Sequence, residues 1–363
     1  MKRRLNYITQ DGWWDTDIDA INQLKVHYDV YVVVVSSNCN NKYPKKVIDG
    51  VSIKDFKMRF SNKNPLSLFQ NIILIFWLLV YRLKRNSINY YVISNNPWQQ
   101  AFMYLTFPLG RTIIAVHNYM PHVDERGKIT TLQPKFYNKF LYFHFYSKQQ
   151  YELFLGEHPV GHHVFFTPMP IKDFGAPNDK YRIEKKGKRV FTLFGNLREY
   201  KRPDLFINAA NAINDPRTIF LIIGSCDEKK WEEYKVLINS ETIKADIRYI
   251  DNDEISDIFT LSDFLVLPYD DATQSGPVMI AVNYGLPLIA SKQPIFESII
   301  DENGFLFEKG SLEDLIKVLR KAISLDDKEL KKMKGAQLEF RNRYLKETNV
   351  ASKFVDFINK HNI

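Results

Sequence analysis

The fold is constrained most by a regular alternation of short apolar runs with longer helical patterns along the whole chain. In the first half, four runs rich in β-branched and aromatic residues are predicted strands: residues 5–9, 30–35, 90–94 and 112–116. In the second half, the predicted strands are residues 189–194, 218–223, 247–250, 264–268, 287–290 and 304–307. Helical patterns fall between them, among others near residues 18–26, 66–83 and 98–107. Such alternation implies right-handed crossovers and mainly parallel sheets, so we expect an α/β protein with two doubly wound, Rossmann-like domains.

The division into two domains follows from the length and from one irregular stretch. A chain of 363 residues, 45% of them hydrophobic, can build two cores of ordinary size. Residues 167–188 contain three prolines, two glycines and many charges, which is typical of a linker. We therefore predict a first domain at residues 1–167, a linker at 168–188, a second domain at 189–345 and a C-terminal helix at 346–363 that packs back on the first domain.

The net charge of +8 is concentrated in the first half of the chain. Residues 1–180 carry 22 Lys and Arg against 13 Asp and Glu, whereas the remaining residues carry 28 against 29. Within residues 51–150 there are 13 basic and 3 acidic residues, together with many aromatic ones and an apolar run at 72–80. That run is far shorter than the roughly 20 residues needed to cross a bilayer. Two interpretations stay open: a buried helix with a solvated basic face, or an interfacial patch that docks on anionic lipid.

Other features narrow the class and the compartment. No recognisable nucleic-acid module accompanies the basic residues, so we expect no nucleic-acid partner. Cys39 and Cys226 are the only cysteines and lie far apart, which excludes a disulfide framework and indicates a reducing cytosol. Residues 5–10, which follow three basic residues, are too short and too polar for a signal-peptide core. We therefore expect a cytoplasmic protein, peripheral on the inner face of the plasma membrane if the interfacial interpretation holds.

Polar loops follow two of the predicted strands, at residues 195–203 and 269–277. Each loop combines small and polar residues and leads into the start of a helix. In α/β sheets this arrangement binds anionic ligands at the carboxyl ends of the strands. Two such loops in one sheet predict a single phosphate-bearing ligand held between them.

The first loop supplies cations and the second supplies uncharged donors. Arg198 and Lys201 lie three residues apart just before Pro203, whose fixed φ suits the first turn of a helix. Two cations near a helix N-terminus favour a diphosphate; the alternative is that they are ordinary surface residues in a turn. The second loop offers hydroxyl, amide and backbone N–H donors to phosphate oxygens, from Thr273, Gln274, Ser275 and Gly276. A Thr or Ser at such a point is also a common helix cap.

The order of motifs along the second half resembles one enzyme family. After Gly195-x-x-Arg198-x-x-Lys201 come Ile222-Ile223-Gly224, an apolar run at 262–269, an Ala-x-x-x-Gly-x-Pro run at 281–287 and the stretch 303–306. Over about residues 189–319 this series is similar to the donor domain of glycosyltransferases of the GT-B fold, specifically those like family 4. The resemblance implies two Rossmann-like domains that face each other across a cleft.

The resemblance also implies how a sugar nucleotide is held. In that family the Arg and Lys of the first loop bind the diphosphate, a role that falls here on Arg198 and Lys201. Ile250 would lie by the nucleotide base, and Gly195 would let the backbone approach the sugar and the phosphates. The complete set of predicted donor-binding residues is Gly195, Asn196, Arg198, Lys201, Gly224, Ile250, Tyr269, Thr273, Gln274, Ser275 and Gly276.

One feature of that family is missing from this sequence. Many members carry two glutamates, the second of them typically bound to the nucleotide ribose, and the corresponding residues here are Ala272 and Ile280. The stretch 272–276 instead resembles the Thr-Gln-Ser-Gly variant of one branch, in which polar donors to the diphosphate replace the acidic pattern. Ribose contacts and a retained anomeric configuration are therefore not carried over to this chain.

Candidate catalytic residues lie in the first half, which is expected to bind the acceptor. Residues 117–122, after the predicted strand 112–116, resemble the His-Asn-x-x-Pro-His loop of the same branch. His117 at a strand end can hydrogen-bond the transferred sugar or the acceptor hydroxyl; the alternative is a histidine that caps a turn. Asp15 and Asp17 are expected in the loop after the first strand, beside two tryptophans, where they suit sugar binding and a general base. The alternative for these two is a helix N-cap pair.

These features predict a glycosyltransferase that moves a hexosyl-type sugar from a UDP- or GDP-linked sugar to a saccharide acceptor. The expected acceptor is lipid-linked, as in bacterial capsule or O-antigen synthesis. Cations and donors of the two loops stabilise the leaving diphosphate, so neither a metal nor a cofactor is required. If the configuration is inverted, Asp15, Asp17 or His117 deprotonates the acceptor; if it is retained, the leaving phosphate does. Two alternatives stay open: a sugar-nucleotide epimerase of the same fold, and a catalytically degenerate protein that only binds sugar nucleotides.

Overall fold

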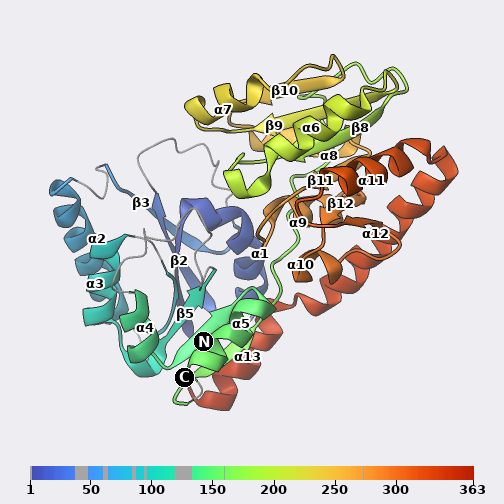
Figure 1. Ribbon diagram of the computed structural model, residues 1–363. Coiled ribbons are helices and arrows are strands. Elements are labelled where there is room, and N and C mark those ends of the chain that lie inside the picture. Colours follow the sequence, from blue (N-terminus) through green and yellow to red (C-terminus); the bar gives the residue numbers. More distant parts are fainter. Residues whose placement is uncertain are drawn as a thin grey trace. The chain divides into compact units, whose positions relative to one another are not determined.

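The chain forms two compact units, seen in the computed structural model of Figure 1. The structure describes residues 2–36, 48–59, 64–83, 87–93, 96–117, 119, 133–158, 160–272 and 274–363. Unit 1 consists of Met1–Pro170 and Glu347–Ile363, and unit 2 consists of Ile171–Lys346. Each unit is built around one parallel sheet.

The sheet of unit 1 has seven strands in the order β3-β2-β1-β4-β5-β6-β7. The strands are β1 (Arg4–Gln10), β2 (Asp29–Ser36), β3 (Ser52–Lys57), β4 (Ile88–Val92), β5 (Thr112–Val116), β6 (Tyr142–Phe145) and β7 (His163–Phe166). The central strands are mostly apolar because both faces of a parallel sheet are buried. β1 pairs with both β2 and β4, so the strand order reverses there. Doubly wound sheets bind ligands at the carboxyl edge of such a switch point.

Two buried clusters hold the helices of unit 1 on its sheet. The helices are α1 (Trp14–Leu24), α2 (Leu66–Leu83), α3 (Pro97–Thr106), α4 (Gln133–Lys139), α5 (Lys148–Glu157) and α13 (Val350–His361), with 3-10 turns η1 (Asp11–Trp13) and η2 (Leu109–Arg111). One cluster joins α1 and α13 to the sheet through side chains such as Ile21 and Phe354. The other includes Leu74 of α2, Met103 of α3 and Phe154 of α5. The C-terminal helix α13 is thus part of the core of unit 1.

The sheet of unit 2 has six strands in the order β10-β9-β8-β11-β12-β13. The strands are β8 (Arg189–Phe194), β9 (Thr218–Gly224), β10 (Ile243–Ile247), β11 (Phe264–Leu267), β12 (Leu288–Ser291) and β13 (Gly304–Phe307). The helices are η4 (Glu199–Lys201), α6 (Pro203–Ile213), α7 (Glu228–Lys235), α8 (Asn252–Leu261), α9 (Gly276–Asn283), α10 (Pro294–Glu297), α11 (Leu312–Ser324) and α12 (Asp327–Glu347). β8 pairs with β9 and with β11, which makes the carboxyl end of β8 the switch point of this sheet.

The predicted fold class of two doubly wound, parallel α/β domains is confirmed, and the differences concern single elements. The prediction of a strand at 247–250 is wrong, because β10 spans Ile243–Ile247 and ends where the predicted strand begins. The helix predicted near 18–26 begins earlier, at Trp14, since η1 follows β1 directly. Strands β3, β6 and β7 were not predicted; β6 and β7 have four residues each, too few for a periodic pattern.

Residues 171–188, which the sequence analysis assigned to a linker, fold against the rest of unit 2. Asp257 on α8 accepts hydrogen bonds from the backbone N–H groups of residues 178–181, at 2.6 to 3.2 Å. Further along, the ammonium group of Lys185 pairs with Asp263 at 2.8 Å. This segment is therefore a fixed part of the second unit.

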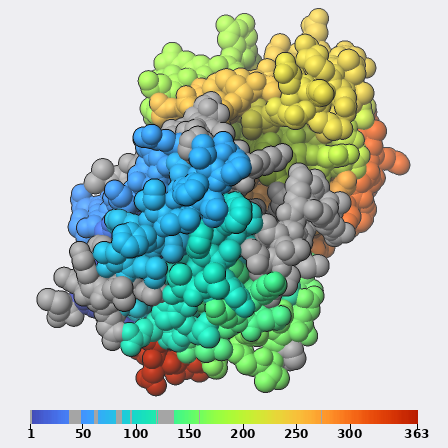
Figure 2. Space-filling view, turned by 90° about the vertical axis from the view of Figure 1, so that its left-hand side faces the viewer, coloured from blue at the N-terminus to red at the C-terminus, as the bar shows by residue number. Residues whose placement is uncertain are grey.

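Helix α2 presents large apolar side chains outward as well as inward. Leu74 and Leu78 face the core, whereas Phe69 and Phe76 are 62% and 67% exposed. The outward residues recur at helical spacing and so gather on one side of the helix: Leu66, Phe69, Ile72, Ile73, Phe76 and Val80. Figure 2 shows a face of the molecule on which residues of this part of the chain, in light blue and cyan, lie at the surface. Of the helices in the described part of the chain, none is long and apolar enough to cross a membrane.

Candidate functional site

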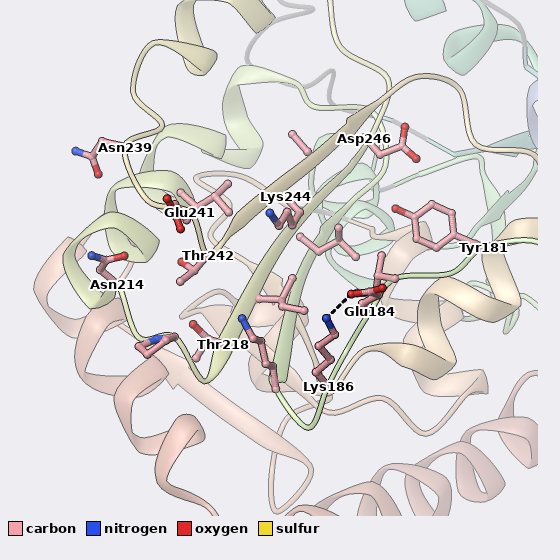
Figure 3. A pocket seen from close by; sticks show the side chains of 17 residues that line it. Tyr181, Glu184, Lys186, Asn214, Thr218, Asn239, Glu241, Thr242, Lys244 and Asp246 are labelled. Carbon is pink, nitrogen blue, oxygen red and sulfur yellow. Dashed lines mark ion pairs between the residues drawn. The ribbon is translucent and has the colours of Figure 1, made fainter.

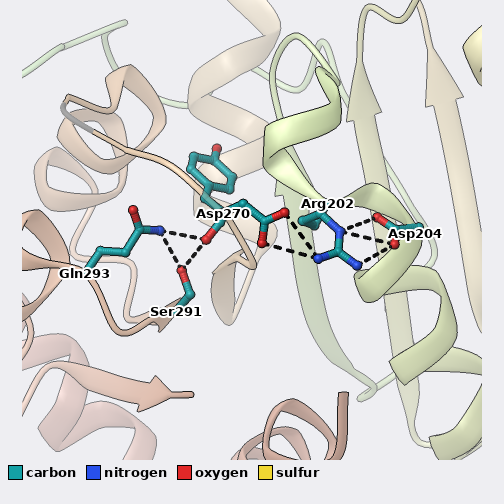
Figure 4. A network of polar contacts seen from close by, with 6 residues as sticks. Arg202, Asp204, Asp270, Ser291 and Gln293 are labelled. Atoms are coloured by element: carbon teal, nitrogen blue, oxygen red, sulfur yellow. Dashed lines mark hydrogen bonds and ion pairs between the residues drawn. The ribbon is translucent and has the colours of Figure 1, made fainter. Parts of the chain in front are cut away.

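The two loops predicted to bind phosphate lie side by side at the carboxyl edge of the unit 2 sheet. They follow β8 and β11, which are neighbouring strands. The backbone N–H of Asp270 donates to the carbonyl of Tyr200 at 2.7 Å, which ties one loop to the other. The guanidinium of Arg202 strengthens this tie through an ion pair with Asp270 at 3.2 Å, and it also pairs with Asp204 in its own segment at 2.8 Å (Figure 4). The hydrogen bond to Asp204, above all, raises the pKa of Arg202 above its usual value.

Lys201 is a buried cation in the first loop. The residue is 7% exposed, and no carboxylate of the described residues forms an ion pair with its ammonium group. The ammonium lies 5.5 Å from the centre of the Tyr269 ring. Burial, and then the nearby charge of Arg198, lower the pKa of Lys201 to about 8. A bound anion would counteract both causes, because it favours the charged form of the lysine.

Two glycines bring the ends of β8 and β9 together beside this lysine. Gly195 and Gly224 have φ values of 106° and 137°, which residues with side chains rarely adopt. A Cβ atom at Gly224 would lie 1.9 Å from the carbonyl oxygen of Gly195. A Cβ atom at Gly195 would lie 3.2 Å from Nζ of Lys201. The absence of a side chain at Gly195 lets the ammonium group of Lys201 approach the backbone. The absence of one at Gly224 lets the ends of β8 and β9 lie close together.

The second loop leads into a helix start that lacks a side-chain cap. Ser275 is the N-cap residue of α9, but its hydroxyl makes no cap hydrogen bond. Ser275 and Tyr269 are 5% and 2% exposed, and their side-chain hydroxyls lie within reach of each other. Burial raises the pKa of the Tyr269 phenol well above its usual value. A helix start without a side-chain cap, with buried hydroxyls beside it, suits a phosphate group.

The start of the second loop is held by the last residue of β12 and by a residue just after that strand. The carbonyl of Tyr269 accepts hydrogen bonds from Ser291 and from the side-chain amide of Gln293, both at 2.6 Å (Figure 4). Gln274 is half-buried and Gly276 is the first residue of α9. Thr273 lies outside the described residues. The structure thus brings the described members of this loop to the same sheet edge as the first loop.

The remaining predicted donor residues lie around this edge. Asn196 is exposed and Arg198 is half-buried in the loop after β8. Ile250 is buried, a short way beyond the end of β10. The sequence analysis missed Arg202, whose role depends on Asp270 of the other loop. Since only folding brings these two together, the sequence offered no signal that separates this arginine from its neighbours.

In unit 1, the ring of His117 lies between two aromatic rings at the carboxyl edge of the sheet. It follows β5 directly and is 3% exposed. Its ring stacks on Trp13 with centroids 3.8 Å apart and an interplanar angle of 6°, and on Tyr146 at 4.3 Å and 11°. Stacking on both faces fixes the plane of the imidazole. Of the predicted loop at 117–122, only His117 and Tyr119 belong to the described residues.

A buried network of hydroxyl and imidazole groups fixes one of these rings. The hydroxyl of Tyr90 contacts that of Tyr146 at 2.7 Å and Nδ1 of His144 at 2.5 Å. Nε2 of His144 contacts the hydroxyl of Thr167 at 2.6 Å. Burial, and then the neighbouring His117, lower the pKa of His144 well below its usual value. The neutral imidazole can then donate to one hydroxyl and accept from the other.

Asp15 and Asp17 lie in the first turn of α1, not in a loop as predicted, because the helix begins directly before them. Neither is the N-cap residue of that helix. Asp17 is fully buried and accepts hydrogen bonds from Tyr7, at 2.7 Å, and from Thr9. Asp15 is half-buried. The two carboxylates thus differ in environment although they share one helical turn.

An open hollow of about 1020 Å³ lies at the other end of the unit 2 strands (Figure 3). Lys188, Pro216 and Thr242, which line it, belong to segments at the amino ends of β8, β9 and β10. At its rim Lys186 pairs with Glu184 at 2.7 Å. The hollow shares no residue with the two loops, and doubly wound sheets bind ligands at the carboxyl ends of their strands. The anion site is therefore expected at the loops, not in this hollow.

Residues 177–338 match a sequence family described as "Glycosyl transferases group 1". This match spans both loops at the carboxyl edge of the unit 2 sheet. The matched residues all lie in unit 2 and are similar to this family. No curated protein sequence matches the chain.

Solved structures share the fold of the matched region and of the rest of the chain. A sucrose-phosphate synthase (tll1590) from Thermosynechococcus elongatus has a TM-score of 0.72 and 12% identity over 99% of either chain. Anabaena Alr3699/HepE in complex with UDP and glucose has a TM-score of 0.70 and 13% identity, over 99% of this chain and 100% of that one. The E. coli structure described as trehalose-6-phosphate bound with UDP-2-fluoro glucose has a TM-score of 0.70 and 10% identity, over 99% of this chain and 98% of that one. At these identities the likeness shows the fold, two Rossmann-like domains of the GT-B type.

Proposed function

We propose that the protein is a glycosyltransferase whose donor is a nucleoside diphospho-sugar. One observation carries the proposal: a buried lysine without a described carboxylate partner lies at the same sheet edge as a helix start without a side-chain cap. A diphosphate fits both features, since it can contact Arg198 and Lys201 with some of its oxygens and the N–H groups of α9 with others. The similarity of unit 2 to the group 1 glycosyltransferases supports the same class of reaction.

The nucleotide and the branch of the family are finer parts of this proposal. Structural neighbours were solved with UDP and with UDP-glucose, which makes UDP the first candidate and GDP the second. The Thr-Gln-Ser-Gly and His-Asn-x-x-Pro-His motifs support membership of a family 4-like branch. The transferred group in this proposal is a hexosyl-type sugar.

The reaction is a group transfer at the anomeric carbon of the donor. The bond between that carbon and the phosphate oxygen breaks, the nucleoside diphosphate leaves with the electron pair, and the acceptor oxygen forms the new bond. Arg198, Lys201 and the start of α9 stabilise the charge that develops on the leaving diphosphate. These groups supply positive potential there, which favours a metal-independent reaction. The acceptor proton passes to a base of unit 1 if the configuration inverts, or to the leaving diphosphate if it is retained.

The three candidate residues of unit 1 take different roles in this proposal. His117 is held in one orientation by two stacked rings, as suits a contact with the sugar or the acceptor hydroxyl. Asp17 is fully buried and accepts two hydroxyl hydrogen bonds, which favours a positioning role. Asp15 is half-buried and is the carboxylate candidate for a general base.

The acceptor in this proposal is a lipid-linked saccharide, met at the inner face of a bacterial plasma membrane during capsule or O-antigen assembly. The apolar outer face of α2 supports it, as do the cations beside that helix. Lys57 and Arg59 are exposed at the end of β3, and the backbone N–H of Arg59 donates to Gln70 of α2 at 2.9 Å. An apolar helix face flanked by cations is typical of a helix that lies in the interface of an anionic bilayer.

Product analysis tests the proposed function. The protein is incubated with UDP-hexoses and GDP-hexoses, alone and with a lipid extract of bacterial membranes, and nucleotides and lipids are followed by mass spectrometry. A glycosyltransferase releases nucleoside diphosphate and forms a heavier lipid only when the acceptor is present, and the Arg198→Ala variant does so far more slowly. Conversion of a sugar nucleotide without acceptor would instead indicate the epimerase. Tight binding without turnover of any donor would indicate the binding protein.

A further inference from the structure

We infer that Arg202 is a positioning residue of the donor site, which holds Lys201 in place by joining the two loops. The inference rests on the proposed function and adds to it a residue that acts through another one, without a contact of its own to the donor. Arg202 lies between Lys201 and Pro203, and the sequence motifs assign it no role. Its backbone conformation and its contacts distinguish it.

The backbone of Arg202 has a conformation that is unusual for an arginine. Its φ and ψ are 51° and 57°, in the left-handed region, which residues with long side chains seldom adopt. The residue before a proline also prefers an extended backbone. Glycine would fit this junction between η4 and α6 more easily. Strained residues persist where the surrounding contacts fix them, and they cluster at functional sites, so a role is expected for this side chain.

The side chain of Arg202 binds two carboxylates at once. Its Nε and Nη2 atoms donate to Asp204 at 2.8 to 3.2 Å, and Nη1 lies 3.2 Å from both carboxylate oxygens of Asp270 (Figure 4). The plane of the guanidinium is thus fixed from two sides. The three side chains are 27% to 44% exposed, and ion pairs at such sites add little to stability. These contacts therefore fix a geometry more than they stabilise the fold.

Three consecutive residues of the first loop contact two consecutive residues of the second. The carbonyl of Tyr200 accepts the backbone N–H of Asp270 at 2.7 Å, and its ring meets that of Tyr269 edge-on with centroids 5.8 Å apart. The ammonium of Lys201 lies 5.5 Å from the centre of the Tyr269 ring. Arg202 then pairs with Asp270. The ion pair thus stands directly beside the contact between Lys201 and Tyr269.

The position of Lys201 depends on the spacing of the two loops. Its Nζ atom lies 3.2 Å from the point that a Cβ atom of Gly195 would occupy, and Cγ of Pro277 lies 3.6 Å from the same point. The ammonium group is therefore near the end of β8 and near the first turn of α9. If the loops separate, the lysine side chain gains rotamers that it loses again when a ligand binds. By holding the loops together, Arg202 preorganises Lys201 for the diphosphate.

Titration calorimetry of the full chain with UDP, GDP and inorganic pyrophosphate tests this inference. Arg202→Gly removes the side chain and suits the left-handed backbone, so the variant should melt within a few degrees of wild type. We expect about tenfold weaker affinity for the probe that wild type binds, because Lys201 is then free to move. In a Lys201→Met background the same substitution should weaken binding by less than about twofold, since its effect passes through the lysine.

Two carboxylate variants separate the tie between the loops from a local effect, without a change to the backbone of Arg202. Asp270→Asn removes the charge pair across the loops and should weaken binding about fivefold. Asp204→Asn removes the pair within one segment and should weaken binding less than about twofold. Equal losses in these two variants would overturn the inference.

The background variant and wild type give the remaining outcomes. A loss in Arg202→Gly that is undiminished in the Lys201→Met background would overturn the inference, because the arginine would then act independently of the lysine. Wild-type affinity in Arg202→Gly, with loss of binding in Lys201→Met, would overturn the inference and leave the proposed function intact. Absence of binding of all three probes to wild type would overturn both.

Discussion

Arg198 and Lys201 are expected to make separate contacts in the donor site, so single substitutions test them. Arg198→Ala and Lys201→Ala each remove one charge-assisted hydrogen bond to the diphosphate, which costs about 2 kcal/mol, or roughly thirtyfold in Kd. Calorimetric titration with the best-bound nucleoside diphosphate measures the effect. Arg217→Ala is the matched control, because Arg217 is 76% exposed and pairs with Asp215 away from the loops. Wild-type affinity in both loop variants would mean that the nucleotide binds elsewhere.

The lowered pKa of Lys201 gives nucleotide affinity a pH dependence. In the unliganded protein this pKa is about 8, whereas a bound diphosphate favours the charged lysine and raises the value. Between these two pKa values binding takes up a proton, so affinity falls as pH rises through 8, by up to about tenfold per pH unit. Titrations at about pH 7, 8 and 9 measure the fall. Lys201→Met lacks the titrating group and should give a flatter profile; an equally steep one would assign the titration to another group.

Gly224 is predicted to be intolerant of even one added carbon atom. A Cβ atom there would lie 1.9 Å from the carbonyl oxygen of Gly195, so Gly224→Ala forces the ends of β8 and β9 apart. We expect a loss of at least about 2 kcal/mol of unfolding free energy, measured by chemical denaturation, together with weaker nucleotide binding. Gly335→Ala is the control, because a Cβ atom at Gly335 on α12 meets nothing within 4 Å. That substitution should leave stability unchanged or raise it; equal stabilities of the two variants would contradict the argument.

At the scale of elements, the outer face of α2 is predicted to bind the membrane surface. Replacing Phe69 and Phe76 with Ser removes the two most exposed apolar side chains of its outer face. We expect about tenfold less protein on anionic vesicles at low salt in sedimentation assays, since interfacial binding scales with buried apolar area. The control replaces Val160 and Val236, which are 85% and 80% exposed outside α2. Equal binding of both double variants, or no preference for anionic over zwitterionic vesicles, would refute the role of α2.

Elements with long or strongly β-branched patterns could be predicted from the sequence. Helix α2 and strands β5, β8 and β13 have the bounds that the sequence predicted. Prediction failed where the signal is short or where tertiary pairing decides. β6 and β7 are aromatic four-residue strands, and β10 starts earlier than expected because its pairing with β9 begins at Ile243. The local pattern contains no information about that register.

At the scale of the whole molecule, two α/β domains follow from the repeated alternation of strands and helices. That the loops after β8 and β11 meet was predictable too, because loops after neighbouring parallel strands lie at one sheet edge. The ion pair of Arg202 with Asp270 was not predictable, since it joins segments far apart in the sequence. The two residues become neighbours only when unit 2 folds. A sequence therefore locates such a site but does not complete it.

The central claim is that unit 2 binds a nucleoside diphosphate at the two loops after β8 and β11. The most direct test is a thermal-shift screen of the full chain with UDP, GDP, CMP and their common sugar conjugates, for wild type, Arg198→Ala and the control Arg217→Ala. A ligand that binds only the folded state raises the melting temperature. We predict a clear rise with one nucleoside diphosphate and its sugar conjugate in wild type and in the control, and loss of that rise in Arg198→Ala. No rise with any nucleotide, or an equal rise in Arg198→Ala, would contradict the account.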